Sequence, residues 1–452
     1  MRFVPVFLSI FLSKIFKSLV NKKEVVYWSL YDFANQPFTT LIVTFIFGKF
    51  FVEGLAPDTI SGTSLWSKGI AVTAILVSLL SPVLGALADS GGYRKKLLML
   101  STYTCVVFTF LLYFFEPGKI FVFGEIKIEG YLLALIVFVI ANIGFEFGTV
   151  FCNSYLSDLS DNNNIGKISG YAWGLGFVGG LISLALSLGL FEVQDTNQVR
   201  NINILVSIWF LVFSVPTLFL LKDVKSKKGF STHLEKSIKS IYYTFRNISK
   251  HKNIVRFLIA RLFYNDALVT IFAFGGIYAG YIGFDYMEVL ILGIVLNISA
   301  CIGSFCLGYF EDKIGVVRML NFTLWMLLFS VFLAFIAPFV VLDKINFIIF
   351  NKDIFEIINP KNLFWISGIL LGFMQGPNQS GSRSLMARLT PDNKKNEFFG
   401  FYAFSGKATS FVGPVLFGLT TSYFGTQQAG LVVVCLFFLI GIILFNSVKF
   451  KS

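Results

Sequence analysis

The sequence predicts an all-α membrane protein whose twelve transmembrane helices form two pseudo-symmetric six-helix bundles. Hydrophobic residues make up 56% of the 452 residues, and charged residues make up only 14%. Soluble domains usually carry about 25% charged residues, so most of the surface of this chain cannot face water. Two further observations are a series of long apolar stretches and a set of polar motifs that occurs twice.

Twelve apolar stretches are each long enough to cross the hydrocarbon core of a bilayer, which takes about 20 residues of helix. We expect every one to be helical, because an open strand or loop in lipid would leave backbone amides unpaired. The stretches cover residues 27–50, 66–88, 96–115, 130–156, 165–190 and 203–221, and then 254–283, 287–310, 317–342, 363–389, 397–421 and 426–447.

Basic residues gather in the loops on one side of the predicted membrane. Arg94 to Lys96 follow the second stretch, a basic link joins the sixth and seventh, and Lys449 and Lys451 end the chain. Because cytoplasmic loops carry an excess of Lys and Arg, both termini are expected to be cytoplasmic. The net charge of +12 therefore reflects loop topology and predicts no nucleic-acid partner.

The chain is expected to divide into four parts. Residues 1–23 form a cytoplasmic N-terminal segment, 24–221 the first bundle, 222–253 the basic cytoplasmic linker, and 254–448 the second bundle. The first segment contains Lys14 and Lys17 and is followed by no small-residue cleavage site. An interfacial helix is therefore favoured over a signal peptide, and a thirteenth span is the remaining alternative.

The cysteines and histidines predict no metal site and no cofactor. All five cysteines lie in apolar stretches without a CxxC pair, and both histidines share one basic loop. Neither zinc nor haem spacing is present, and we expect no catalytic residue.

Motifs of the first half recur in the second half, which indicates a duplicated six-span unit. The offsets between the matching residues are similar, and the order is kept. The pairs are Gly85 to Asp89 with Gly308 to Asp312, Tyr31-Asp32 with Tyr264-Asn265-Asp266, and Ser154, Leu159 and Gly170 with Ser384, Leu389 and Gly400. Parallel six-span halves are an architecture of transporters, which bind substrate between the halves near mid-membrane.

Charged residues inside the stretches mark a candidate pathway, because a charge at the bilayer centre costs at least about 2.5 kcal/mol. Asp266 and Lys407 are expected near mid-membrane. We expect a polar cavity between the bundles that binds a zwitterion or gates its path; the alternative is a set of structural ion pairs. The predicted substrate or ion pathway comprises Tyr31, Asp32, Asn35, Glu146, Asn153, Arg261, Asn265, Asp266, Tyr402 and Lys407. Burial could let Asp32 or Asp266 carry a coupling proton.

Residues at the cytoplasmic ends of the stretches are candidates for a gate. We expect Gly85 to permit close helix packing and Asp89 to meet a helix N-terminus or a base. Such a network can hold one conformation and be released in the other; the alternative is a solvated turn. The predicted gate comprises Gly85, Asp89, Arg94, Asp158, Asp312, Arg383, Arg388 and Glu397.

The loop Gly85-Ala-Leu-Ala-Asp89-Ser-Gly-Gly-Tyr-Arg94-Lys-Lys resembles the signature loop of the major facilitator superfamily. Four further motifs resemble its vacuole-effluxer-like branch, which is related to the autophagy-associated vacuolar amino-acid effluxer of fungi. They are Trp28-Ser-Leu-Tyr-Asp-Phe-Ala-Asn35, Tyr264-Asn-Asp266, Ser382-Arg-Ser-Leu-Met-Ala-Arg-Leu-Thr-Pro391 and Glu397-Phe-Phe-Gly-Phe-Tyr-Ala-Phe-Ser-Gly-Lys-Ala-Thr-Ser410. The similarity extends from about Glu24 to Phe445. Gln36-Pro37 and Ser157 depart from the family pattern.

The resemblance implies a major facilitator fold and, in the fungal relatives, export of amino acids. We therefore expect a secondary active or facilitative transporter in the bacterial cytoplasmic (inner) membrane. It is expected to be monomeric and to move a small polar solute, most of all an amino acid, by alternating access, with a proton or other ion as a possible coupling partner. The rivals are a transport-inactive receptor or scaffold on the same fold, and a Mg²⁺-dependent transferase based on Asp158-Leu-Ser-Asp161.

Overall fold

The computed structural model describes residues 22–161, 163–192, 195–223, 230–339 and 359–449. Almost all of the described chain is helical. Ten helical stretches among these residues are long and apolar enough to cross a membrane. The predicted N-terminal segment lies outside the described residues except for Lys22 and Lys23, which begin the first helix.

The first half contains six membrane-length segments and a short hairpin. Its helices are α2 (Lys22–Pro37), α3 (Phe47–Phe50), α4 (Thr59–Gly91), α5 (Arg94–Leu111), α6 (Gly130–Ser154), α7 (Leu156–Leu159), α8 (Ile165–Leu190), α9 (Thr196–Val199) and α10 (Asn201–Val215). π-Helical stretches cover Phe38–Phe45, Phe51–Leu55 and Pro216–Leu220, and a 3₁₀ turn covers Leu112–Phe114. Strands β1 (Ile120–Phe123) and β2 (Ile126–Glu129) pair antiparallel, with Ile120 opposite Glu129.

The linker and the second half follow. The helices are α11 (Phe230–Arg246), α12 (Lys252–Ile282), α13 (Tyr286–Ile314), α14 (Val316–Ile336), α16 (Pro360–Leu389), α17 (Lys395–Lys407), α18 (Val412–Phe424) and α19 (Gln427–Phe445), with 3₁₀ turns at Ile248–His251, Ala337–Phe339 and Asp392–Lys394. The eleventh predicted span differs from the expectation of one continuous helix, since α17 and α18 are separated by residues 408–411.

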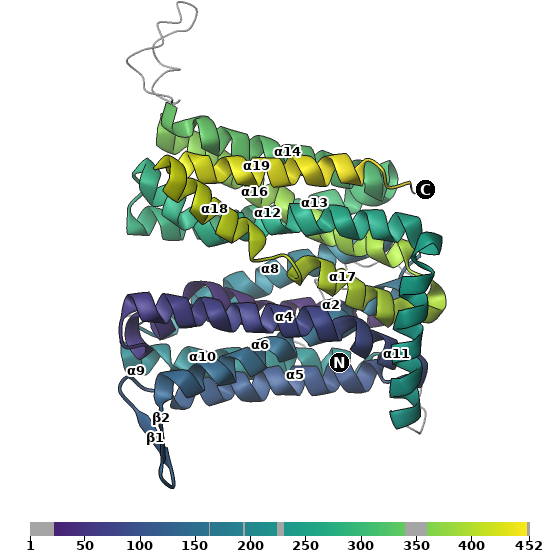
Figure 1. Ribbon diagram of the computed structural model, residues 1–452, viewed down its shortest axis with the longest axis horizontal. Helices are drawn as coiled ribbons and strands as arrows, with labels where there is room; N and C mark the ends of the chain where they lie inside the picture. The colour runs from purple at the N-terminus through teal and green to yellow at the C-terminus, as the bar shows by residue number, and fades with distance from the viewer. Residues whose placement is uncertain (1–21, 162, 193–194, 224–229, 340–358, 450–452) are drawn as a thin grey trace, which may run out of the picture.

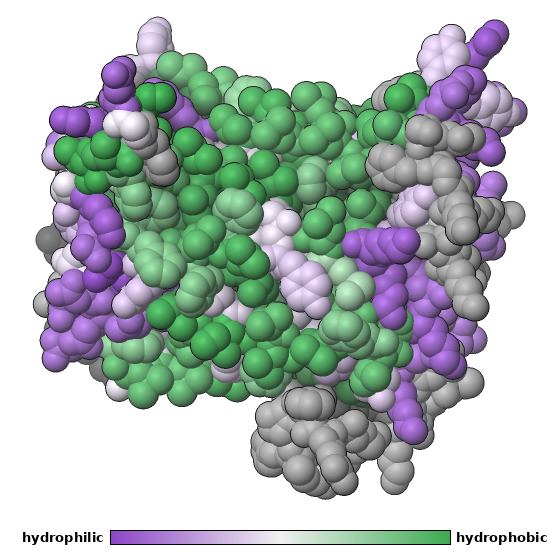
Figure 2. Space-filling model, turned by 90° about the horizontal axis from the view of Figure 1, so that it is seen from below, coloured by the Kyte–Doolittle hydropathy of each residue, from purple (hydrophilic) through white to green (hydrophobic). Residues whose placement is uncertain are grey.

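The helices lie side by side in two stacks (Figure 1). One stack contains α4, α5, α6 and α10, and the other contains α12, α13, α14, α16 and α19. Helix α11 crosses one end of the bundle, and the β hairpin projects from the other. Between the two ends, the lower face is covered by apolar side chains, and hydrophilic residues gather at both ends (Figure 2). This distribution fits a protein embedded in a bilayer.

Pro37 shapes the first span. A proline has no N–H to donate to the carbonyl four residues earlier, which here belongs to Phe33. The indole Nε1 of Trp209 donates to that carbonyl oxygen instead, at 3.1 Å. The helix continues beyond Pro37 as a π-helical stretch, so this departure from the family pattern is accommodated by a local change of helix type.

Glycines let helices of the two halves approach backbone to backbone. A Cβ added to Gly85 of α4 would lie 2.2 Å from the carbonyl oxygen of Asn396 of α17. In the equivalent place, a Cβ on Gly170 of α8 would lie 2.6 Å from Cα of Gly308 of α13. These are the pairs α4–α17 and α8–α13, which form extensive contacts between the halves.

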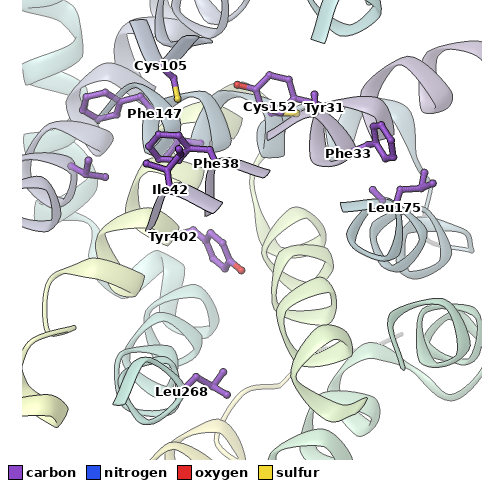
Figure 3. Close-up of a cluster of buried hydrophobic side chains, with 14 of the residues drawn as sticks. Tyr31, Phe33, Phe38, Ile42, Cys105, Phe147, Cys152, Leu175, Leu268 and Tyr402 are labelled. Carbon is purple, nitrogen blue, oxygen red and sulfur yellow. The ribbon is translucent and has the colours of Figure 1, made fainter. Parts of the chain in front are cut away.

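Apolar side chains from both halves meet in the interior. Tyr31 and Phe38 of the first span and Cys105 of α5 lie in one part of this cluster, while Leu268 of α12 and Tyr402 of α17 approach from the second half (Figure 3). Tyr31 is fully buried and Tyr402 nearly so. The core is therefore continuous across the two halves.

Substitution of Gly303 on α13 tests the close packing of helices inside the second half. A Cβ on this residue would lie 1.9 Å from the carbonyl oxygen of Phe373, the carbonyl that Pro377 leaves without its usual donor. Overpacking of this kind typically costs about 1–3 kcal/mol. We expect Gly303→Ala to lower the apparent melting temperature of the detergent-solubilised protein.

Gly418 of α18 provides the matched control, because a Cβ there would meet nothing within 4 Å. Alanine is favoured over glycine in a helix by about 1 kcal/mol. Gly418→Ala should therefore melt at the wild-type temperature or above it. An unchanged melting temperature for Gly303→Ala would contradict the packing described for α13 and α16.

Candidate functional site

The halves meet most tightly at one end of the bundle, called here the basic end. It carries Arg94 to Lys96, the linker helix α11 and Lys449. Asp89, in the last turn of α4, accepts hydrogen bonds from the first turn of α17. Its Oδ1 accepts from the backbone N–H of Asn396 at 3.1 Å and from the side-chain amide of Asn396 at 2.7 Å, and its Oδ2 accepts from the N–H of Glu397 at 2.8 Å.

Asp312 makes the equivalent contact in the opposite direction. It lies near the end of α13, and its two carboxylate oxygens accept from the backbone N–H groups of Gly166 at 2.9 Å and Lys167 at 2.8 Å, in the first turn of α8. The first N–H groups of a helix have no partner within the helix, and an anion there is stabilised by about 0.3–2 kcal/mol. Each half therefore supplies a carboxylate that completes a helix of the other half.

Ion pairs surround both carboxylate contacts. Arg94 is almost buried and bonds to Asp158 at 2.6 Å and to Asp223 at 2.7 Å. Asp158 also pairs with Lys395 at 2.6 Å, and Lys395 begins α17, so this pair joins the halves. Arg388 pairs with Asp312 at 2.8 Å. Asp158 is thus held by two cations, an arrangement that favours the gate over the transferase for the Asp158-Leu-Ser-Asp161 motif.

The linker helix α11 touches both halves across the same contact. Its Ser237 shares a hydrogen bond with Ser90 of α4 at 3.1 Å. Its Ser240 and Thr244 donate to Glu397 of α17, which is 1% exposed. Nearby, desolvation and Lys394 lower the pKa of His251 at the end of the linker. The linker therefore bonds to both helices of the α4–α17 contact.

Arg383 is the most heavily bonded charge between the halves. It lies on α16 with 2% of its side chain exposed, and it pairs with Asp32 of α2 at 2.8 Å. It also donates to the Asn153 side chain at 3.1 Å and to the side chain and carbonyl of Ser169 at 3.0 and 2.8 Å. The residue was expected at the gate; the structure places it with the pathway residues Asp32 and Asn153.

Glu146 and Lys407 form the second charged pair between the halves. Glu146 lies on α6 and Lys407 at the end of α17, and their charged atoms are 2.6 Å apart. The bases distinguish this pair from the preceding one, since the Lys407 side chain is 36% exposed and that of Arg383 is 2% exposed. The two acids are alike, with Glu146 16% and Asp32 15% exposed.

Arg261 and Asp266 have no oppositely charged partner in the described part of the chain. Of the charged residues predicted inside the spans, the described structure pairs Asp32 with Arg383 and Glu146 with Lys407. Arg261 donates to the Tyr402 carbonyl at 2.7 Å and lies over its ring at 3.7 Å. Asn265 donates to the Gly406 carbonyl at 2.9 Å, and Asp266 accepts from the Gly413 N–H at 3.2 Å. These side chains bind the broken eleventh span.

Tyr31 and Asn35 lie inside the first half. The Tyr31 hydroxyl shares a hydrogen bond with Thr102 at 2.9 Å, and Asn35 is 6% exposed. Sequence reasoning missed Ser169, Lys395 and Asn396. Asn396 and Glu397 occupy the position that Gly166 and Lys167 occupy in the first half, so the internal repeat was the signal that could have found Asn396 and its neighbour Lys395.

The comparisons with known proteins identify the family. The model described as "Vacuole effluxer Atg22 like" matches residues 50–166 and 157–452. The chain belongs to the Atg22-like family. It is similar to the uncharacterized MFS-type transporter YxiO of Bacillus subtilis, with 26% identity over 92% of both chains. It is also similar to autophagy-related protein 22 of Vanderwaltozyma polyspora, with 22% identity over 89% of this chain and 86% of that protein.

Solved structures show the fold of this Atg22-like chain. A double Trp mutant of XylE matches with a TM-score of 0.71 and 12% identity, over 97% of both chains. A bacterial homologue of the iron transporter ferroportin in an outward-facing state matches with a TM-score of 0.68 and 12% identity, over 94% and 98% of the two chains. The predicted major facilitator fold and family are confirmed, and the relatives are membrane transporters rather than enzymes.

Substitution of the Asp32–Arg383 pair tests the contact between the halves of this Atg22-like protein. Removing one partner of a buried ion pair leaves an uncompensated charge and typically costs about 3–5 kcal/mol. We expect Arg383→Gln to lower the apparent melting temperature by several degrees.

The double variant Asp32→Asn with Arg383→Gln should recover much of that loss, because neutral partners carry no buried charge. The measurement is thermal unfolding of the single and double variants in detergent. A double variant less stable than Arg383→Gln would contradict the pairing.

Proposed function

We propose that this Atg22-like transporter moves an amino acid across the membrane by alternating access. The observation that carries the proposal is the Glu146–Lys407 pair, which presents one negative and one positive group between the halves and is partly exposed. An amino acid carries the complementary charges. Its carboxylate would bind Lys407 and its ammonium group would bind Glu146, each in place of the partner side chain.

Alternating access is supported by the way the halves are held together. Strong polar contacts between the halves gather at the basic end, where Asp89 and Asp312 bind helix starts. These contacts connect two surfaces without a covalent link, so a rocking motion can break and reform them. We infer from these contacts that the basic end is closed in this conformation and that a solute would reach Glu146 and Lys407 from the opposite end.

The orientation and environment follow from the charge distribution. The excess of Lys and Arg at the basic end supports a cytoplasmic position for both termini, and the similarity to a Bacillus protein supports a bacterial cytoplasmic membrane. We propose a monomer as the working unit, because both halves of the site come from one chain. Asp32 and Asp266 are the candidate residues for a coupling proton.

Transport is tested by reconstitution into liposomes with a panel of labelled amino acids, with and without a pH gradient. We expect uptake, efflux or exchange of at least one amino acid above protein-free liposomes. Absence of all three for every amino acid would remove the proposed substrate class. That result would not affect the fold, and a transport-inactive receptor would then become the favoured function.

Neutral isosteres separate a substrate-binding pair from a structural one. The double variant Glu146→Gln with Lys407→Met removes both charges together, so no unpaired charge is left and folding should be preserved. If the pair binds the zwitterion, transport should fall at least about tenfold, which corresponds to ~1.4 kcal/mol. Retained transport in this double variant would show that the pair only holds α6 and α17 together.

The Lys361–Glu288 pair is the matched control. Its charged atoms are 2.7 Å apart, and its side chains are 40% and 31% exposed. It joins α13 and α16, which both belong to the second half. The variant Lys361→Met with Glu288→Gln should transport at the wild-type rate.

A further inference from the structure

The eleventh span is interrupted, and its two parts have different neighbours. Helix α17 packs along α4 of the first half and also against α6. Helix α18 packs mainly against α12 and α19 of its own half. Other side chains of α18 are exposed at the surface, with Leu419 60% and Tyr423 84% exposed. Helix α17 is thus in contact with helices of the first half, whereas α18 is attached mainly to helices of the second half.

Helix α12 supplies the groups that satisfy the backbone on both sides of the interruption. Arg261 and Asn265 donate to carbonyl oxygens near the end of α17, where a helix carries partial negative charge. Asp266 accepts from the N–H of Gly413 in the first turn of α18, where a helix carries partial positive charge. Donors therefore meet the end of one helix and an acceptor meets the start of the next.

The Asp266 carboxyl is buried, and only one of its two oxygens accepts a hydrogen bond from the described part of the protein. The residue is 2% exposed, and its Oδ1 has no hydrogen-bond partner among the described residues. No cation of the described chain forms an ion pair with it. Helices α18 and α19 contain no charged residue. Lys407 of α17 is paired with Glu146, Arg383 of α16 is paired with Asp32, and Arg261 donates to α17.

The space around the start of α18 is also restricted. A Cβ on Gly413 would lie 2.2 Å from Oγ1 of Thr270 and 3.0 Å from Oδ1 of Asp266. The backbone of α18 can approach α12 only because residue 413 is a glycine. The hydrogen bond between Gly413 and Asp266 therefore depends on close docking of the two helices.

We propose that Asp266 is the proton-binding residue of the transporter and that its protonation state controls the docking of α18 on α12. The inference rests on the proposed transport function and names the group that takes the coupling proton. Ionised Asp266 accepts from the Gly413 N–H and complements the start of α18. When the free oxygen takes up a proton, the carboxyl becomes neutral and the charge that holds the helix start is lost. Movement of α18 away from α12 is thereby linked to the binding of one proton by Asp266.

Hydrogen–deuterium exchange of the full-length protein in lipid nanodiscs tests this link without any substrate. The readout is the exchange rate of the peptide covering residues 408–418, divided by that of a peptide from α19 to remove the general effect of pH. Asp266→Asn mimics the protonated carboxyl. We expect this variant to raise the ratio about fivefold, the factor that corresponds to ~1 kcal/mol of stabilisation at a helix terminus.

The pH profile separates a proton switch from a purely structural cap. In the wild-type protein, the ratio should rise as the pH falls and reach the value of Asp266→Asn, and the variant itself should show no dependence on pH. A wild-type ratio that stays constant with pH would overturn the proposal even if Asp266→Asn exchanges faster. A wild-type ratio equal to that of the variant at every pH would overturn it as well.

Gly413→Ala gives a second route if Asp266→Asn fails to fold. The added methyl group should displace α18 from Asp266 and raise the ratio at every pH, whereas Gly418→Ala, with open space around it, should keep the wild-type profile. An unchanged profile in Gly413→Ala would contradict the proposed docking. Loss of amino-acid transport with an intact pH response removes only the proposed function. Transport without a pH response of α18 removes only the present inference.

Discussion

The arrangement of the two halves depends on carboxylates that bind helix starts across the interface. Asp89 of α4 completes α17, and Asp312 of α13 completes α8. Both contacts require backbones in close approach, which Gly85 and Gly308 permit. The buried Asp32–Arg383 pair and the more open Glu146–Lys407 pair lie between the same halves. Loss of the carboxylate contacts would release the surfaces that carry all of these groups.

The same physical device is used twice at the interface and once within the second half. At the basic end, acids meet helix starts that belong to the other half, so the contact is made or broken as the halves move. At the interruption between α17 and α18, Asp266 meets a helix start of its own half. The first arrangement suits a gate that follows rocking of the bundles, and the second suits a local movement of α18.

Much of the fold could be predicted from the sequence because the bilayer limits the choices. Apolar stretches of sufficient length must become helices, and the repeat of Gly85 to Asp89 at Gly308 to Asp312 indicates the duplicated bundle. The contact of Asp89 with a helix N-terminus follows from the signature loop. The interruption at residues 408–411 was not predicted, although Gly413-Pro414 follows it closely and Pro414 has no N–H to donate to the carbonyl of Ser410. The partners of Arg261 and Asp266 depend on that interruption, so the sequence alone did not reveal them.

The most direct test of the account is a distance between the halves at the basic end. Spin labels at Lys96→Cys on α5 and Arg318→Cys on α14, both exposed positions, would be compared by double electron–electron resonance in a background without native cysteines. Each carboxylate contact is worth about 1 kcal/mol. Asp89→Asn combined with Asp312→Asn should therefore shift the population towards longer distances by about thirtyfold. Asp58→Asn, at an exposed helix start within one half, should leave the distances unchanged. An unaltered distance distribution in the double variant would contradict the central role of these contacts.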